Sequence, residues 1–344
     1  MKKPLLQTQT RVRRTYRGGK MLDQFLGKEN GIDGFCPEDW ISSFTEAKNK
    51  DPVPMEGISH VLAGGKPVPI TALVSPEDFG PGRRESGVLV KLLDAGERLG
   101  IQVHPTPAFS LAHFGSPHGK TECWHILHAE KDAAVYVGFR EGITREEWKR
   151  LFETQNVAGM LERLHRFPVT AGDTVLVTAG TPHAIGKGCF LLEIQEPTDY
   201  TMRAEKITVA GETLTPQQIH YGAGEEALLD CFIYEGLPER EAKARYFLSS
   251  KKGGADFAPQ MMVTYEDTPC FALGVLSSGE HLCPQSFVTL VFTQGGRIRI
   301  GETPLEVVRG DRIFAPYGSG KICALDAEAI VCFPPKIGKE TSQC

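Results

Sequence analysis

Short apolar runs separated by glycine and proline turns recur along the chain. Val88 to Leu93, Ala133 to Phe139 and the run that begins at Phe167 each have the length and apolar content of a strand. Tight-turn signals such as Ala171-Gly-Asp173 lie between such runs. Many short strands with turns of this kind predict a mainly β protein built from barrel-like sandwiches.

One stretch has helical periodicity instead. Thr144-Arg-Glu-Glu147 is a capping-box pattern, and apolar residues follow it at helical spacing from Trp148 to Phe152. A second helix is predicted at about 157–166. The pair predicts a short helical insertion, at about 144–166, in an otherwise β-rich chain.

The pattern of strands and turns occurs twice. Residues 167–183 contain a strand, a Gly-Asp turn, a second strand and a Thr-Pro turn, and Leu305 to Tyr317 has nearly the same order. This repeat predicts two related β-domains. The second copy has Tyr317-Gly-Ser where the first has Thr181-Pro-His183, so it lacks the histidine. Because His183 is one of the candidate metal ligands described below, we expect no metal site in the second copy.

The repeat also suggests a division of the chain. We expect a metal-binding catalytic domain at 1–210, a polar linker region at 211–262 and a C-terminal β-domain at 263–344. The 344 residues, 41% of them hydrophobic and 24% charged, are enough for two hydrophobic cores.

Composition and charge exclude several kinds of partner and location. The longest apolar runs are too short to span a membrane, and the N-terminus lacks the apolar core of a signal peptide. A net charge of -5 argues against a nucleic-acid partner, and we interpret the basic cluster Arg11-Val-Arg-Arg14 as a solvated face. Nine cysteines without a C-x-x-C pair favour reduced thiols in a cytoplasmic protein.

A few polar residues interrupt the apolar runs in a way that suggests metal binding. Gln102 and His104 are two residues apart, so on a strand both side chains point to the same side. Glu122 begins another predicted strand, and His183 follows a Gly-Thr-Pro turn. Two histidines, a carboxylate and an amide oxygen suit a divalent metal such as zinc and leave a position open for substrate. Spacing alone does not establish that ligands so far apart meet.

Four motifs in the same order resemble a known family. They are Lys91-Leu-Leu-Asp-Ala with Ile101-Gln-Val-His-Pro105, Gly119-Lys-Thr-Glu-Cys-Trp124, Gly180-Thr-Pro-His-Ala-Ile185, and Glu193-Ile-Gln through Arg203. Together they resemble type I mannose-6-phosphate isomerases, in particular the short bacterial form. The resemblance implies two cupin-type jelly-roll sandwiches and an aldose–ketose isomerase that interconverts mannose 6-phosphate and fructose 6-phosphate.

The resemblance also implies roles for single residues. His104, Glu122, His183 and Gln102 would hold one zinc ion, although Gln102 could instead orient His104 or the substrate. Arg203 matches the family's catalytic arginine; the alternative is a surface arginine paired with Glu205. Two lysines complete the set. Lys120 would transfer a proton or hold the substrate, and Lys91 would bind the sugar phosphate.

Several positions depart from the family pattern. Gly100 stands where the family has a serine near the phosphate, and Glu196-Pro-Thr-Asp199 and Met202 replace its usual residues before the arginine. We therefore keep two alternatives, an isomerase of another, even unphosphorylated, aldose and a non-catalytic zinc cupin that binds a sugar. The sequence leaves the oligomeric state open between a monomer and a homodimer.

Overall fold

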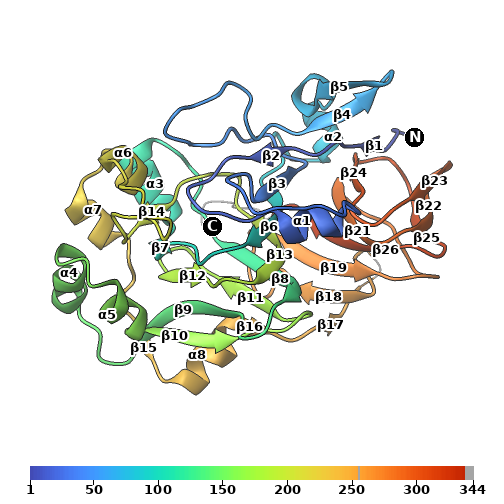
Figure 1. Ribbon diagram of the computed structural model, residues 1–344. Coiled ribbons are helices and arrows are strands. Elements are labelled where there is room, and N and C mark those ends of the chain that lie inside the picture. Colours follow the sequence, from blue (N-terminus) through green and yellow to red (C-terminus); the bar gives the residue numbers. More distant parts are fainter. Residues whose placement is uncertain (255, 338–344) are drawn as a thin grey trace.

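Four largely antiparallel sheets, stacked one behind the next, form the body of the protein in this computed structural model (Figure 1). The structure describes residues 1–254 and 256–337, so the last part of the predicted C-terminal domain, 338–344, lies outside the described residues. The predicted mainly β class is confirmed. In the described part of the chain, every helix is too short or too polar to cross a membrane.

The first sandwich consists of an inner and an outer sheet. Its inner sheet contains, in spatial order, β16 (Phe247–Leu248), β11 (Thr174–Val177), β8 (Glu122–Ala129), β13 (Cys189–Gln195), β6 (Leu89–Ala95), β3 (Glu38–Ile41) and β2 (Arg11–Val12). Its outer sheet contains β10 (Leu164–Pro168), β9 (Ala134–Arg140), β12 (His183–Ile185), β7 (Gln102–Val103) and β14 (Met202–Arg203), and β15 (Gly236–Leu237) pairs with β9.

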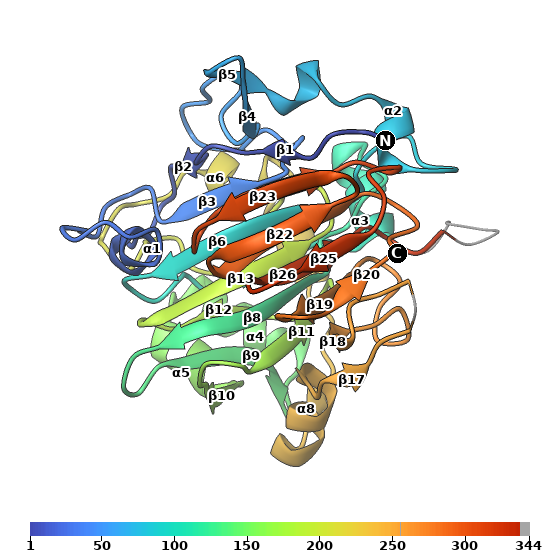
Figure 2. The same cartoon turned by 90° about the vertical axis from the view of Figure 1, so that its right-hand side faces the viewer.

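The second sandwich has the same plan. Its inner sheet contains β1 (Leu5–Leu6), β24 (Arg312–Ala315), β21 (Val288–Gln294), β26 (Glu328–Phe333), β19 (Ala272–Leu276), β18 (Gln260–Val263) and β17 (Lys251–Lys252). Its outer sheet contains β20 (His281–Leu282), β25 (Ile322–Ala324), β22 (Gly296–Ile300) and β23 (Thr303–Val307). Figure 2 looks along the stack and shows these strands in front of β6, β13 and β8.

The two inner sheets pack face to face, and alternation along the strands explains how. On β6, Val90 and Leu92 join a core that also contains Val291 and Phe314 of the second sandwich, whereas Leu93 lies in the core of the first sandwich. The inner sheets are therefore buried on both faces, which agrees with the nearly continuous apolar runs in their sequence.

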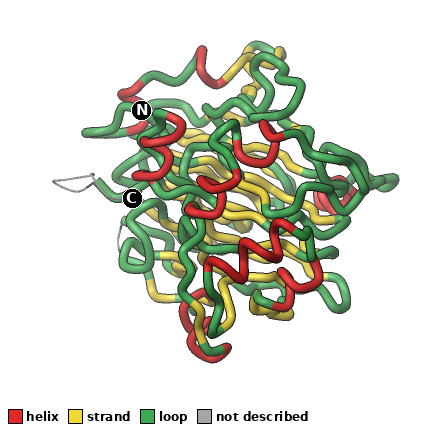
Figure 3. Tube along the Cα trace, turned by 90° about the vertical axis from the view of Figure 1, so that its left-hand side faces the viewer, coloured by secondary structure: helices red, strands yellow, loops and turns green. Residues whose placement is uncertain are grey.

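Helices cover the outer face of the first sandwich (Figure 3). The described helices are α1 (Lys20–Phe25), α2 (Pro76–Phe79), α3 (Pro107–Phe114), α4 (Arg145–Glu153), α5 (Val157–Glu162), α6 (Pro216–His220), α7 (Glu225–Asp230) and α8 (Glu239–Tyr246). Of these, α3 to α7 contribute to the core of that outer face, whereas α1 and α2 pack against the core between the two inner sheets. A 3-10 turn at Ile70–Ala72 follows a separate hairpin of β4 (His60–Ala63) and β5 (Lys66–Pro69). Thr144 caps α4 as predicted. The predicted end of the second helix at 166 is wrong, because residues from Leu164 pair with β9 as β10.

Two segments connect the halves more closely than the sequence suggests. Residues 211–262, predicted as a linker region, contain α6 to α8, and their short strands β15 and β16 join sheets of the first sandwich. In the other direction, β1 at the N-terminus pairs with β24 of the second sandwich. The N-terminal arm then crosses to the first sandwich, where β2 pairs with β3.

Candidate active site

The candidate site lies inside the first sandwich, on the face of the inner sheet opposite to the second sandwich. Glu122 on β8 shares its strand face with Trp124 and Ile126, which belong to the first sandwich's core. By the same alternation, Glu193 on β13 and Lys91 on β6 point to that side. On this face the three polar residues have apolar neighbours along their own strands, Trp124, Leu93 and Leu191.

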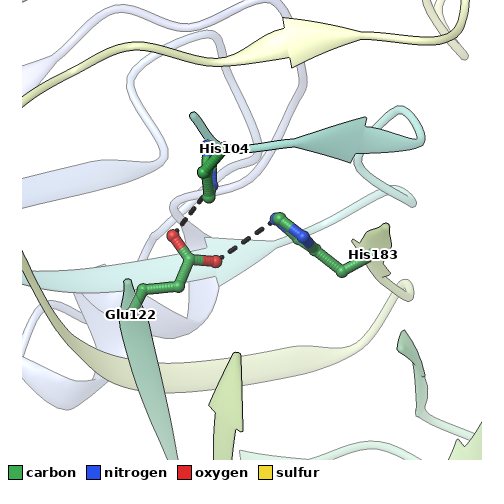
Figure 4. A group of neighbouring side chains, drawn as sticks. All are labelled: His104, Glu122 and His183. Atoms are coloured by element: carbon green, nitrogen blue, oxygen red, sulfur yellow. Dashed lines mark ion pairs between the residues drawn. The ribbon is translucent and has the colours of Figure 1, made fainter. Parts of the chain in front are cut away.

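His104, Glu122 and His183 form a compact cluster at one end of this interior (Figure 4). One candidate ligand atom from each lies within 4.8 Å of the others, and all three side chains are buried. Nε2 of His104 is 2.9 Å from Oε2 of Glu122, and Nε2 of His183 is 3.3 Å from Oε1. The outer sheet brings the histidines together, because His183 pairs directly with Gln102 and His104 follows β7.

Both histidines direct a lone pair at the carboxylate. Nδ1 of His104 lies 3.0 Å from the carbonyl oxygen of Tyr200, and Nδ1 of His183 lies 2.9 Å from that of Thr181. A carbonyl accepts only, so each Nδ1 carries the proton and each Nε2 is unprotonated in the neutral ring. Burial outweighs the attraction of Glu122 and lowers the pKa of His104 to about 3, so the ring is neutral at pH 7. Burial lowers the pKa of His183 as well.

These acceptors fit a divalent cation. Oε2 of Glu122 is buried and receives no hydrogen bond of good geometry from any described residue. Burial raises the pKa of Glu122, but the neighbouring His104 and Lys120 outweigh it, so the carboxyl has a pKa well below its usual value. Two imidazole lone pairs and one carboxylate therefore converge on one point, the donor set that zinc prefers in open sites. Each Nδ1 hydrogen bond fixes its ring in the orientation that metal binding needs.

Gln102 and Lys120 lie beside this cluster. The amide nitrogen of Gln102 is 3.2 Å from Nε2 of His183, so rotation of the amide would present its oxygen to the same point. Nζ of Lys120 is 2.9 Å from Nε2 of His104 and 3.1 Å from Oε2 of Glu122. The sequence-predicted ligands and Lys120 thus meet in one place.

A pocket opens next to the cluster, and charged side chains dominate its wall. Its five basic and four acidic side chains are Arg14, Lys91, Arg98, Lys120, Arg203, Glu38, Glu193, Asp199 and Glu205. Gln102 and Gly100 also line it, whereas Ile207 and Val209 lie on a turn that carries exposed apolar side chains at its edge. Such a wall suits a small, highly polar molecule rather than an apolar one.

A buried ion network forms one side of the pocket. Arg14 donates two hydrogen bonds to Asp199, at 3.0 and 2.8 Å, and its Nε is 2.9 Å from Glu38. Nζ of Lys91 is 3.0 Å from Glu193 and 3.8 Å from Glu38. The interpretation of Arg11 to Arg14 as a solvated face is therefore wrong for Arg14, which packs inside the protein against two carboxylates.

The network controls the protonation of its acids. Burial alone would raise the pKa of Glu38, but the positive charges of Arg14 and Lys91 lower it to about 2. The same two cations hold the pKa of Asp199 well below its usual value against the effect of burial. Glu193 differs, because burial raises its pKa more than Lys91 lowers it. Glu193 is thus the acid of the network whose protonated form burial favours.

Arg203 points into the pocket and has no carboxylate partner among the described residues. Its guanidinium donates to the carbonyl oxygens of Thr201, at 3.2 Å, and of Gln218 on α6. Glu205, the partner in the alternative interpretation, instead accepts two hydrogen bonds from Arg98, at 2.6 and 3.0 Å. A positive charge that faces the pocket without a neutralising acid is available for an anionic group.

Sequence reasoning missed several pocket residues. Asp199 lies in the Glu193 to Arg203 motif of the family resemblance, which was the one signal available for it, and Glu38 lies in Pro37 to Ser42, where the resemblance is weak. Arg14 was assigned to the surface, and Gln218, whose carbonyl oxygen accepts a hydrogen bond from the pocket residue Arg203, lies in the segment predicted as a linker. All of these contacts join residues that are far apart in the chain.

Comparison with known proteins gives relatives of one kind. The chain is 41% identical over 129 residues, 37% of its length, to the probable mannose-6-phosphate isomerase GmuF of Bacillus subtilis, and spans 40% of that relative. It is 30% identical over 238 residues to mannose-6-phosphate isomerase ManA of the same organism, 68% of this chain and 70% of the relative. The chain thus spans less than half of the first of these relatives. No family profile matches it.

A solved structure shares the fold. A crystal structure of mannose 6-phosphate isomerase in its zinc-bound form superimposes with a TM-score of 0.71 over 97% of this chain and all of the other, at 16% sequence identity. The likeness confirms the pair of cupin-type sandwiches. At this identity it establishes the arrangement of the sheets and not the role of any residue.

Proposed function

The chain belongs to the mannose-6-phosphate isomerase family, and we propose that it interconverts mannose 6-phosphate and fructose 6-phosphate. The observation that carries the proposal is the His104–Glu122–His183 cluster next to a polar pocket, whose wall includes the Lys120 that contacts the cluster. We further propose that the chain acts in the cytoplasm, as a monomer or homodimer, and that residues 1–210 form the catalytic domain and 263–344 a second domain.

The cluster is proposed to hold one zinc ion, through His104, Glu122, His183 and the amide oxygen of Gln102. The converging lone pairs and the buried oxygen of Glu122 that lacks a well-aligned donor support this assignment. When bound, the ion would polarise sugar oxygens as a Lewis acid.

The charge balance of the pocket supports an anionic substrate. Its five basic side chains face four acidic ones, and Glu122 next to the pocket adds a fifth acid. The formal charges of the protein groups therefore cancel, and a divalent ion would leave a net positive pocket. That sign matches a dianionic phosphate ester.

The remaining residues are proposed to orient the sugar and move its proton. Isomerisation shifts a proton between C1 and C2 through an enediol(ate), whose negative charge Arg203 would stabilise. Lys120, buried beside the cluster, would transfer the proton or hold the substrate. Lys91 remains the candidate for contact with the phosphate end, although its ammonium group is 3.0 Å from Glu193 and would have to share that partner.

A second candidate substrate is an unphosphorylated aldose. Gly100 contributes no side chain to the pocket wall, and a Cβ there would lie 3.9 Å from the carboxyl carbon of Glu205. Glu205, a buried carboxylate that pairs with Arg98 at this end of the pocket, can also accept hydroxyl groups of a neutral sugar. The same isomerase chemistry would then act on a neutral sugar. A sugar-binding cupin without turnover is less well supported, because a pure binder needs no proton-transfer group such as Lys120.

The test is turnover of mannose 6-phosphate before chelation, after chelation and after zinc is returned, with mannose and related aldoses assayed in parallel. We expect activity with mannose 6-phosphate that disappears with the chelator and returns with zinc. Turnover of free aldoses without turnover of mannose 6-phosphate would show that the substrate is an unphosphorylated aldose. No turnover of any sugar by protein that contains a full equivalent of metal would overturn the proposed function in favour of a binding protein.

A further inference from the structure

The N-terminal arm, residues 5–16, begins on the second sandwich and ends in the pocket of the first. Leu5 and Leu6 pair with β24, and Gln7 donates its backbone N–H to the carbonyl oxygen of Arg312 at 3.0 Å. The arm then forms β2, and beyond it Arg14 and Tyr16 line the pocket. These two residues, and Thr15 between them, are therefore brought to the pocket by a segment that is anchored on the other half of the protein.

A buried ion pair fastens the arm where it crosses between the halves. The guanidinium of Arg312 on β24 donates to Oδ2 of Asp39 on β3, and both side chains are almost fully buried. The other oxygen of Asp39 accepts the backbone N–H of Thr10, in the arm, at 2.6 Å. Arg312 also donates to the carbonyl oxygen of Gly310, at 3.1 and 2.7 Å, so each nitrogen of its guanidinium makes a hydrogen bond. A buried pair with its hydrogen bonds satisfied fixes one geometry, because any other leaves charges unpaired.

Asp39 is next to a pocket residue on the same strand. Successive side chains of a strand point to opposite faces, so Asp39 faces the second sandwich while Glu38 faces the pocket. Glu38 accepts the hydroxyl of Tyr16 at 2.7 Å and lies 2.9 Å from Nε of Arg14. A shift of β3 or of the arm would therefore move three groups of the pocket wall together.

We propose that Arg312 is a positioning residue for the substrate pocket. Through Asp39 it holds the arm and β3 in register, and these two segments place Arg14, Tyr16 and Glu38. Arg312 itself touches neither the pocket nor the metal cluster. The second sandwich, whose role the sequence left open, thus takes part in substrate binding as well as covering the first.

The test compares Arg312→Met, Arg312→Lys and the double variant Asp39→Asn/Arg312→Met. The asparagine side chain of the double variant can still accept from Thr10, and it removes the buried charge that the single methionine variant leaves unpaired. The activity measurement rests on the proposed function. We expect KM for mannose 6-phosphate to rise about 10-fold or more in Arg312→Met, since small displacements far from the chemistry have large effects. We expect kcat to fall much less and metal content to stay at the wild-type value.

Hydrogen exchange supplies a readout that does not depend on the reaction. We expect backbone amides of the arm, Thr10 and Arg14 among them, to exchange faster in Arg312→Met, and Arg312→Lys to restore part of both effects. Arg297→Met is the matched control, because it breaks an exposed pair with Asp326 in the same half of the protein. It should change neither KM nor exchange in the arm.

The outcomes separate the two proposals. If wild-type protein does not turn over mannose 6-phosphate, the proposed function fails, and exchange in the arm still tests the positioning role. Unchanged KM together with unchanged exchange in folded Arg312→Met protein would overturn that role. A lower melting temperature in both methionine variants, without either effect, would show that the pair serves stability alone.

Discussion

The two sandwiches share a turn but differ in the segment after it. In the first, Gly172 has φ 96° and Asp173 accepts the N–H of Thr170 at 2.7 Å. In the second, Gly310 has φ 88° and Asp311 accepts the N–H of Val308 at 2.9 Å. A left-handed glycine and an aspartate that closes the turn thus join two strands in both halves.

Beyond the turn, the halves diverge. The first continues through Gly180-Thr-Pro to His183, which is completely buried beside Glu122. The second continues through Pro316 and Tyr317, and a cluster of apolar side chains, Phe292 and Phe333 among them, packs in its interior. The shared features are those that make strands and turns, and the features that differ are the side chains at strand ends. The fold tolerates the charges of the ion network in the first interior because they pair with one another, so its chemistry is separable from its architecture.

The strongest test of this separation removes one proposed ligand. His183→Ala should lower kcat/KM by more than about 1000-fold, because loss of the metal would remove several kcal/mol of electrostatic stabilisation. Metal content, measured by mass spectrometry of the protein, should fall well below one ion per chain. The secondary structure should persist, since the core packing of both halves is unchanged.

His125→Ala is the matched control for that variant. His125 lies on the same strand as Glu122 but contacts Thr174 rather than the cluster. Its Nδ1 is 3.0 Å from the hydroxyl oxygen of Thr174. The variant should keep its metal and most of its activity. Full metal content in His183→Ala would contradict the ligand assignment, and collapse of the fold would show that site and architecture are not separable.

Acid should affect the two halves differently, because the first contains the buried ion network and the second has an apolar interior. The pKa of Glu38 is about 2 in the folded protein, below the value of about 4.3 for an unperturbed glutamate. A lowered folded pKa contributes stability that is complete above about pH 4.3 and is lost as the pH falls towards 2. The contribution amounts to roughly 3 kcal/mol in the free energy of unfolding, and Asp199 has a shift of the same sign.

Hydrogen exchange between about pH 4.5 and 2.5, corrected for the intrinsic rates, should therefore show the first half loosening before the second. Glu38→Gln should be less stable at pH 7 and should lose part of the pH dependence, because its side chain does not titrate. A profile for Glu38→Gln parallel to that of the wild type would mean that Glu38 does not control acid stability.

The sequence was informative where local pattern determines structure. Alternation and turn signals predicted the strands, and the spacing of Gln102 and His104 placed both near one point. The meeting of His104, Glu122 and His183 followed only from the family resemblance, because strand pairing over such distances leaves no local trace. The helix expected to reach 166 shows the same limit: pairing of 164–168 with β9 overrides the local helical pattern.

Ion pairs inside the protein were the hardest features to predict. Arg14 and Asp199 are 185 residues apart, and nothing in either segment marks the other as its partner. A basic cluster is usually solvated, so composition pointed Arg14 to the surface. The burial of Arg14 results from the crossing of the N-terminal arm from one sandwich to the other, which is a property of the whole fold.

A smaller effect on KM should distinguish residues that hold the pocket wall in place from residues that only stabilise the helices on the outer face of the first sandwich. The hydroxyl of Tyr221 donates to the carbonyl oxygen of Asp199 at 3.0 Å and accepts the N–H of Thr201 at 3.1 Å. Tyr221→Phe should lose about 1–2 kcal/mol of stability and raise KM several-fold, because the segment that carries Arg203 loses two supports. Tyr234→Phe, whose hydroxyl donates only to Leu229 at 2.8 Å, should lose similar stability with unchanged KM. Equal KM values in the two variants, measured below both melting temperatures, would mean that the segment holds its position without Tyr221, and that the strands alone determine the geometry of the pocket.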